Sequence, residues 1–421
     1  MPSFSRHWIL VAVFIAGVLL RAAYVAQTPH DVRAYDWEGH VGYIHYVADH
    51  GTIPPAQAGW EYYQPPLYYF ITGGWMAAAQ HVGMTEPVIL RSIQWFSFLL
   101  SCVALAAGIW IGLLLFGRER RTALAILFAG VIAVFPGLVY HASRITNDTL
   151  FLTFSFVWCG LLLSWWRDGR ARDWHLSCLV LAFALLTKST ALPYFPIAAV
   201  CLFLRPRTSW RQRLRLGGIG AGVILLLSGW IFILRFIVER ETFIVGNHLN
   251  DDLRIRNTAV HLLRFNPFQI LAHPYNANWD ESMDRQFFWE NFFKSSIVGE
   301  WNWGPVLEPL VRWLETIGLS AIPLALWGIV RESRKPLRWF SPLLIMSVFL
   351  IFSAFSYRVL SPFSPNQDFR FVPVVLVPLI AFILFAIRDA HEPLYRYGCS
   401  LMTAGIVASA ALVILVPFFV S

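Results

Sequence analysis

The chain has 421 residues, of which 57% are hydrophobic and only 14% are charged. Soluble domains carry about 25% charged residues, so this composition excludes a soluble globular protein. The formal net charge is +8, but the sequence has no basic stripe with interleaved aromatic residues, which argues against nucleic acid as a partner. The composition therefore predicts an integral membrane protein.

Apolar segments recur along the whole chain, and most approach the roughly 20 residues that a helix needs to cross a bilayer. Eleven segments are predicted to be transmembrane helices: 8–25, 92–116, 122–142, 149–166, 174–187, 189–204, 216–237, 309–330, 339–357, 371–387 and 398–420. Arg21 and Tyr24 stand where a signal peptide needs small residues, so the first segment is expected to remain as a helix. The predicted fold is an all-α polytopic membrane protein with about 11 spans.

Basic residues predict the orientation, because Lys and Arg accumulate in inner loops. Placing the N-terminus and five basic stretches inside assigns 18 of the 33 Lys and Arg residues, but only 6 of the 25 acidic residues, to the inner side. The five stretches are 117–121, 167–173, 205–215, 331–338 and 387–397. The positive net charge is therefore interpreted as the result of membrane topology.

This orientation leaves two long loops outside, residues 26–91 and 238–308. The apolar segment 67–83 would reverse the charge rule if it crossed the membrane, so we predict a short helix at the outer interface. Three parts follow: 1–237 as the first membrane module, 238–308 as the second outer loop, and 309–421 as the C-terminal helices.

The first outer loop combines acidic, histidine and aromatic residues. Asp36 and His40 are four residues apart and share a face if this stretch is helical. An Asp beside a His could act on a hydroxyl as a general base, although Asp36 could equally cap the helix. Pro65 and Pro66 remove two backbone donors and hold Gln64 extended, which suits a wall of a binding site or a hinge.

Further polar residues lie at predicted outer ends of spans. Arg144 could bind a phosphate and Asp148 a hydroxyl or a cation, or both could belong to a neutral turn. Lys188 lies where two spans meet, and Arg370 precedes a later span. Because ionisable residues are costly at membrane level and tend to persist where they function, we expect these clusters to share one outer-face site.

The second outer loop mixes tryptophans with carboxylates between residues 273 and 304. This composition suits sugar binding or amphipathic helices lying on the membrane. His248, His261 and His273 are too irregularly spaced to indicate a metal site. The five cysteines lie in or beside apolar spans and form no disulfide framework.

Four features occur in order along the chain: an N-terminal span, the acidic motif at Asp36, a PPL sequence at 65–67 that starts a short helix, and Asp148 after the third span. This order resembles the GT-C superfamily of polyprenyl-phosphate-dependent glycosyltransferases. The similarity is greatest to the protein O-mannosyltransferases, the lipid A aminoarabinose transferase and family 39-like bacterial proteins. It is clearest over about residues 30–190, with a later match at 368–371.

The resemblance implies roles for individual residues. Asp36 matches the catalytic base, His40 the later His or aromatic residue, and Asp148 the second Asp of the family. Trp37 replaces the customary Glu. Gln64 stands where many members carry a Lys, so the donor phosphate is assigned to this position together with three cations: Arg144, Lys188 and Arg370. The expected substrate-binding residues are Glu38, Glu61, Tyr63, Trp289 and Trp301.

The implied reaction is an inverting transfer of a hexosyl or pentosyl group from a polyprenyl-phosphate donor to a hydroxyl of a lipid, glycan or protein. It would occur on the outer face of the plasma (inner) membrane, or in the endoplasmic reticulum of a eukaryote. No cofactor is certain, because only some branches of the superfamily require a divalent cation. A lipid or glycan transporter or flippase and a catalytically degenerate scaffold remain as alternatives; transport would require mid-span polar residues and internal symmetry.

Overall fold

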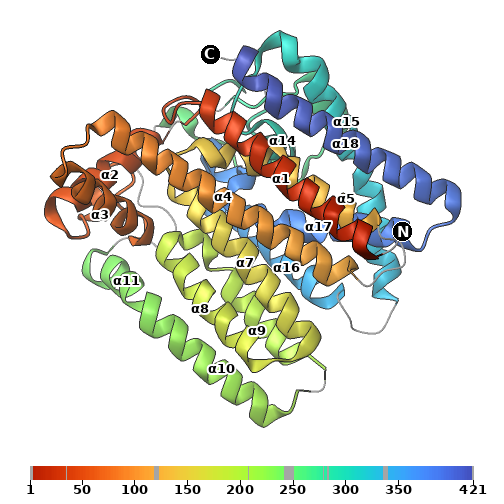
Figure 1. Ribbon diagram of the computed structural model, residues 1–421, viewed down its shortest axis with the longest axis horizontal. Helices are drawn as coiled ribbons and strands as arrows, with labels where there is room; N and C mark the ends of the chain where they lie inside the picture. Colours follow the sequence, from red (N-terminus) through yellow and green to blue (C-terminus); the bar gives the residue numbers. More distant parts are fainter. Residues whose placement is uncertain are drawn as a thin grey trace. The chain divides into compact units, whose positions relative to one another are not determined.

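The computed structural model describes residues 3–34, 36–117, 123–206, 208–240, 251–277, 279–281, 284–334 and 340–419. Figure 1 shows that these residues are mostly helical, and within them the only β-type pairing is an isolated bridge between Arg254 and Phe363. The predicted all-α fold is confirmed. The basic stretches 117–121 and 331–338 lie partly outside the described residues, and His248 lies outside them.

Seven helical segments in the described chain are long and apolar enough to cross a membrane. They are α1 (Ser3–Gln27), α4 (Glu86–Phe116), α7 (Asn147–Asp168), the segment Trp210–Val238, α15 (Gly304–Ser333), α16 (Phe340–Leu360) and α18 (Glu392–Phe419). An eighth span would combine α5 (Ala123–Val134) with Pro136–Ser143 across a bend of 56°. The chain is an integral membrane protein, but the predicted number of eleven spans is not confirmed.

Three predicted spans correspond to shorter helices. These are α8 (Ala171–Thr187), α9 (Tyr194–Leu204) and α17 (Leu376–Arg388). The segment Trp210–Val238 contains α10 (Trp210–Ile224), the π-helical turns η4 (Leu225–Gly229) and η5 (Leu234–Val238), and between them α11 (Trp230–Ile233).

The chain forms two compact units by its internal contacts. Unit 1 contains residues 1–24, 105–139 and 250–421, and unit 2 contains residues 25–104 and 140–249. The chain passes between them within α4. Because this partition describes compactness alone, the three-part division expected from the sequence stays a prediction.

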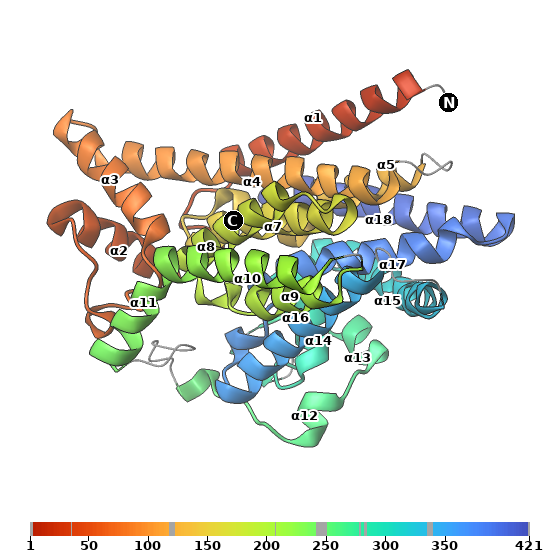
Figure 2. The ribbon, with the colours of Figure 1, turned by 90° about the horizontal axis from the view of Figure 1, so that it is seen from below.

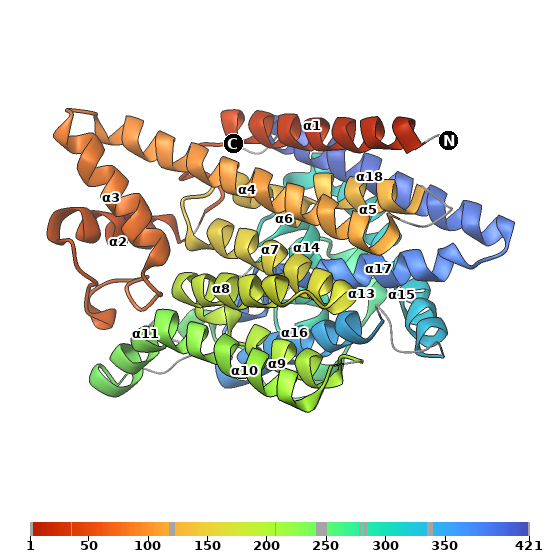
Figure 3. The same ribbon diagram turned by 60° about the horizontal axis from the view of Figure 1, so that its bottom comes forward.

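In unit 2, helices α7, α8, α9 and α10 lie side by side (Figures 1 and 3), and α2 (Trp37–His50) packs on α3 (Leu67–His81). A Cβ atom at Gly73 would lie 2.8 Å from the Val47 side chain, so glycine permits the close approach of α2 and α3. Figure 2 shows this pair near α11. The helix predicted at 67–83 is present, and its place at the membrane interface stays a prediction.

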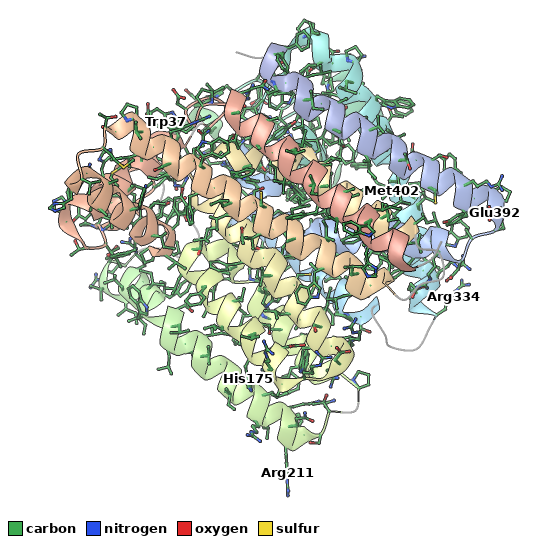
Figure 4. All side chains as sticks on the ribbon, viewed as in Figure 1. Trp37, His175, Arg211, Arg334, Glu392 and Met402 are labelled. Atoms are coloured by element: carbon green, nitrogen blue, oxygen red, sulfur yellow. The ribbon has the colours of Figure 1, made fainter. Side chains whose placement is uncertain are left out.

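In unit 1, α15 packs against α17 and α18, and α14 (Phe288–Val298) contacts α15. Arg21 of α1 is buried and donates to the Ala133 carbonyl of α5 at 2.6 Å. An apolar cavity of about 330 Å³ lies among α5, α14, α15, α17 and α18. Its walls include Phe292, Ile317 and Met402, which is labelled in Figure 4.

Candidate active site

The start of α7 places two polar side chains in the interior of unit 2. Thr146 caps the helix, because its hydroxyl accepts a hydrogen bond from the Asp148 N–H at 2.8 Å. Asn147 and Asp148 therefore lie in the first turn, where the helix dipole favours a negative charge. Asp148 is only 4% exposed. A buried carboxylate requires compensation by a cation or by hydrogen bonds.

Lys188 provides this compensation. It directly follows α8 in an extended backbone conformation, and its Nζ atom forms a buried ion pair with Asp148 Oδ1. Two residues that the sequence nominated for different roles, the second Asp and a phosphate-binding cation, are thus brought together across 40 positions of the chain. Removing one member of such a buried pair typically costs about 3–5 kcal/mol, because the other charge is left unpaired.

Gln64 joins the first outer loop to the start of α7. Its Nε2 donates to Glu61 Oε2 at 3.0 Å and to the Tyr63 hydroxyl at 2.9 Å. Its Oε1 accepts from Asn147 Nδ2 at 3.2 Å, and the same Nδ2 donates to the Thr187 carbonyl at 2.9 Å. One amide therefore connects two predicted substrate-binding residues to the neighbour of Asp148.

Asn147 is a site residue that the sequence analysis did not identify. It is completely buried and lies between Gln64 and the residue that precedes Lys188. The available clue was its position, directly before Asp148 in the first turn of a helix that starts with a capping Thr.

His40 is buried on α2 and faces α3. Its Nδ1 lies 2.7 Å from the Tyr69 hydroxyl, and the Tyr69 ring stacks on Tyr43 with 3.7 Å between ring centroids. Burial raises the pKa of Tyr69 well above its ordinary value of 10, so this hydroxyl stays protonated and can donate to His40. The arrangement orients the imidazole within the pair of helices.

Asp36 precedes α2 and is partly exposed, whereas Glu38 is exposed in the first turn. The capping alternative for Asp36 is not supported, because its side chain makes no capping hydrogen bond. Arg144 is buried in the same unit, four residues before Asp148, and its N–H donates to the His141 carbonyl. The roles assigned to these three residues stay predictions.

The remaining predicted site residues belong to unit 1. Arg370 pairs with Glu300 at 3.3 Å, and both side chains are largely buried. Trp289 lines the apolar cavity, and Trp301 is partly exposed. Their proposed parts in donor and substrate binding are untested.

The described part of the chain contains no evident site for a divalent cation. No group of three or more His, Cys, Asp or Glu side chains is placed there to hold a metal ion. Cys159, Cys178 and Cys201 are buried, and Cys102 and Cys399 are partly exposed.

Comparisons with known proteins agree with this architecture. A family model described as dolichyl-phosphate-mannose-protein mannosyltransferase matches residues 65–232, a stretch that contains Asn147, Asp148 and Lys188. The crystal structure of ArnT from Cupriavidus metallidurans bound to undecaprenyl phosphate matches with a TM-score of 0.53 and 16% identity, over 92% of this chain and 62% of ArnT. ArnT in the apo state matches with a TM-score of 0.45 and 14% identity, over 98% of this chain and 78% of ArnT.

A search of curated protein sequences finds no match. The chain shares its fold with ArnT, and this likeness and the family-model match support the resemblance to the GT-C superfamily that the sequence predicted. The chain is similar in structure to ArnT and, over residues 65–232, in sequence to the mannosyltransferase model. The chain spans 62% of the length of the ArnT structure with bound undecaprenyl phosphate, so its activity and substrates are proposals.

Proposed function

We propose that this protein is a membrane glycosyltransferase that moves a sugar from a polyprenyl-phosphate donor to an acceptor hydroxyl. The observation that carries the proposal is the buried Asp148–Lys188 pair, together with the hydrogen bonds that link Asn147 to Gln64. An ion pair buried at the start of a helix is a costly arrangement in a membrane protein, and such residues usually mark a functional site. The mannosyltransferase family model covers Asn147, Asp148 and Lys188.

The proposed donor is a lipid whose phosphate binds near the start of α7 and the end of α8. Lys188 and Arg144 in unit 2, and separately Arg370 in unit 1, are the candidate phosphate-binding cations, since fixed positive charges stabilise the charge that develops on a leaving phosphate. The apolar cavity of unit 1 would accommodate part of a hydrocarbon chain. The bound undecaprenyl phosphate in the ArnT crystal supports this donor class.

The proposed reaction is a single displacement with inversion. Asp36 takes the proton from the acceptor hydroxyl, and the acceptor oxygen forms a bond to the anomeric carbon from the face opposite the phosphate. The bond between that carbon and the phosphate oxygen breaks, and its electron pair leaves with the polyprenyl phosphate. Asp148 keeps Lys188 in place, and His40 contributes to the acceptor side from α2.

Sugar and acceptor hydroxyls would be bound by carboxylates, a phenol and aromatic faces. The residues proposed for this role are Glu38, Glu61, Tyr63, Trp289 and Trp301. Glu61 is buried and already accepts a hydrogen bond from Gln64, which holds one carboxylate oxygen in a fixed direction.

The active site is proposed to face outward from the plasma (inner) membrane. Figure 4 shows Arg211 at the N-terminal end of α10, the end far from α2 and α3 within unit 2. Lys and Arg accumulate on the inner side of membrane proteins. The basic start of α10 therefore supports an inner position for that end and an outer position for α2 and α3.

The proposal is tested with the purified protein in liposomes and labelled polyprenyl-phosphate sugars. Asp36→Asn should abolish formation of the new glycosidic bond while the protein still inserts and folds. Asp49→Asn, an exposed position on the same helix, is the matched control and should transfer sugar at the wild-type rate. Unchanged turnover in Asp36→Asn rules out the assigned base. Intact donor moved across the bilayer without a new bond would favour the transporter.

A further inference from the structure

Arg235 is a buried cation near the C-terminal end of the membrane segment Trp210–Val238. It lies in the π-helical turn η5, and only 7% of it is exposed. Its Nη1 donates to the Pro54 carbonyl at 3.1 Å and its Nη2 to the Tyr62 carbonyl at 2.6 Å. The guanidinium therefore binds both ends of the loop formed by residues 54–62.

Glu239 completes this contact. Its Oε2 accepts from Arg235 Nη1 at 2.6 Å and from the Ala56 N–H at 3.3 Å. Burying a guanidinium is costly unless its donors are satisfied, and an apolar side chain would pack here without that cost. The presence of a charged residue at this buried position is explained if Arg235 stabilises the loop through its carbonyls and does not stabilise the helix. π-helical turns within α-helices also occur frequently at functional sites.

The loop held by Arg235 leads directly into the polar network. Glu61 belongs to the loop, and Gln64 lies two residues after the end of the loop at Tyr62. Tyr62, whose carbonyl Arg235 binds, donates from its hydroxyl to the Gly42 carbonyl of α2 at 3.0 Å and packs against the Tyr43 ring. The loop is thereby fixed between the end of η5 and α2.

A second connection runs through Tyr43. Its ring lies 5.4 Å from the Tyr62 ring, and its hydroxyl lies 3.5 Å from the Gln64 carbonyl. Its ring stacks on Tyr69, the partner of His40. Through Tyr62, whose ring packs against Tyr43, Arg235 is linked to the Gln64 carbonyl and, by way of Tyr69, to His40.

We propose that Arg235, together with Glu239, is a positioning residue of the active site. It holds loop 54–62 in the conformation in which Gln64 bonds to Asn147 and Glu61 is fixed beside it. The proposal rests on the proposed transferase function for its kinetic consequence, but the ordering of the loop can be measured independently of activity. Arg235 itself touches no reacting atom in this scheme.

The test compares Arg235→Gln and Arg235→Lys with Arg213→Gln. Arg213 is the matched control, because it lies on the same membrane segment and donates to a backbone carbonyl, that of Arg205, at 3.1 Å. Each protein is reconstituted in nanodiscs for kinetics and for hydrogen exchange of residues 54–66. Arg235→Gln should lower kcat by about 10- to 100-fold, as expected for small displacements of site residues.

The donor KM should change little in Arg235→Gln, and exchange in residues 54–66 should become faster. Arg235→Lys should recover part of both values, because an ammonium can bind one of the two carbonyls. Arg213→Gln should match the wild type. If Arg235→Gln does not fold, Glu239→Gln supplies the same comparison with a milder expected loss, because the Ala56 contact is weakened while the guanidinium remains.

The outcomes separate this proposal from the proposed function. If the wild type is active and Arg235→Gln keeps its kcat, the positioning role is wrong. If the wild type transfers no sugar from any polyprenyl-phosphate donor, the transferase function fails, and hydrogen exchange decides the role of Arg235. Faster exchange of residues 54–66 in Arg235→Gln, but not in Arg213→Gln, then supports the loop contact, and equal exchange overturns it.

Discussion

The two long loops that are predicted to lie outside each contact a buried arginine, but the two arginines have different partners. In the first loop, Arg235 binds the Pro54 and Tyr62 carbonyls and pairs with the carboxylate of Glu239. The arginine that contacts the second loop is Arg358 of α16, which is fully buried and donates hydrogen bonds to neutral groups. These are the Arg256 carbonyl at 2.6 Å, the Gln286 carbonyl at 3.3 Å, Gln367 Oε1 at 3.1 Å and the Asn257 side chain.

The surroundings of the two loops also differ in polarity. The first loop continues into the polar network of Glu61, Gln64 and Asn147. The second loop continues into α14, whose aromatic residues Trp289 and Phe292 line an apolar cavity. The same type of backbone contact therefore adjoins a polar hydrogen-bond network in the first loop and an apolar cavity in the second.

The largest expected effect comes from the buried ion pair of unit 2. Lys188→Met leaves the Asp148 carboxylate buried without its cation, so the free energy of unfolding should fall by about 3–5 kcal/mol and transfer should cease. Arg370→Met should cost less, because its pair with Glu300 is longer and more exposed. Chemical unfolding in detergent and the liposome transfer assay measure both quantities.

A double variant separates stability from activity at this pair. Lys188→Met with Asp148→Asn removes both charges and should regain much of the lost stability while staying inactive. If Lys188→Met alone is as stable and as active as the wild type, the pair neither stabilises unit 2 nor serves the reaction, and the polar site has to lie elsewhere.

The next effect tests whether the two arginines differ in function. Arg358→Gln removes hydrogen bonds from a charged donor to several neutral acceptors, so the free energy of unfolding should fall by roughly 3 kcal/mol. The kcat of the molecules that remain folded should decrease less than in Arg235→Gln, because Arg235 holds the loop that leads to Gln64, whereas Arg358 binds Arg256, Asn257 and Gln286. An equal decrease of kcat in both variants, at equal stability, contradicts the distinction between the loops.

Local features of the fold were predictable from the sequence. Pro65 and Pro66 indicated that a helix begins after them, and α3 starts at Leu67. Thr146 precedes α7 as a capping residue, and the apolar runs mark the main helices. The predicted span 122–142 is bent near Pro136, because a proline lacks the N–H that a continuous helix requires.

The pairing of site residues was less accessible from the sequence. Asp148 and Lys188 were both nominated, but their contact depends on how α7 packs against α8. Arg235 was hidden inside a predicted span, and its partners Pro54 and Tyr62 lie more than 170 positions away. Side-chain contacts over such separations are set by tertiary packing, which the pattern of apolar residues does not encode.

The smallest expected effect concerns one histidine in each loop. Burial lowers the pKa of His30 in the first loop, and Asp31 and Arg91 act on it in opposite directions. Burial also lowers the pKa of His261 in the second loop, and there the nearby arginines, first among them Arg358, lower it further. Of these two histidines, only His261 has a pKa that is influenced by the arginine bound to its own loop.

Both histidines favour the neutral form in the folded protein. Their contribution to stability is complete above the ordinary pKa of 6.5 and is lost as the pH falls through the lower folded value. Arg358→Gln removes a positive charge near His261, so the pKa of His261 should rise while that of His30 stays constant. Exchange of the histidine C2 protons, followed by mass spectrometry across a pH series, measures both values. If the pKa of His261 is unchanged in Arg358→Gln, Arg358 does not affect that histidine, and the two loops respond to acid alike.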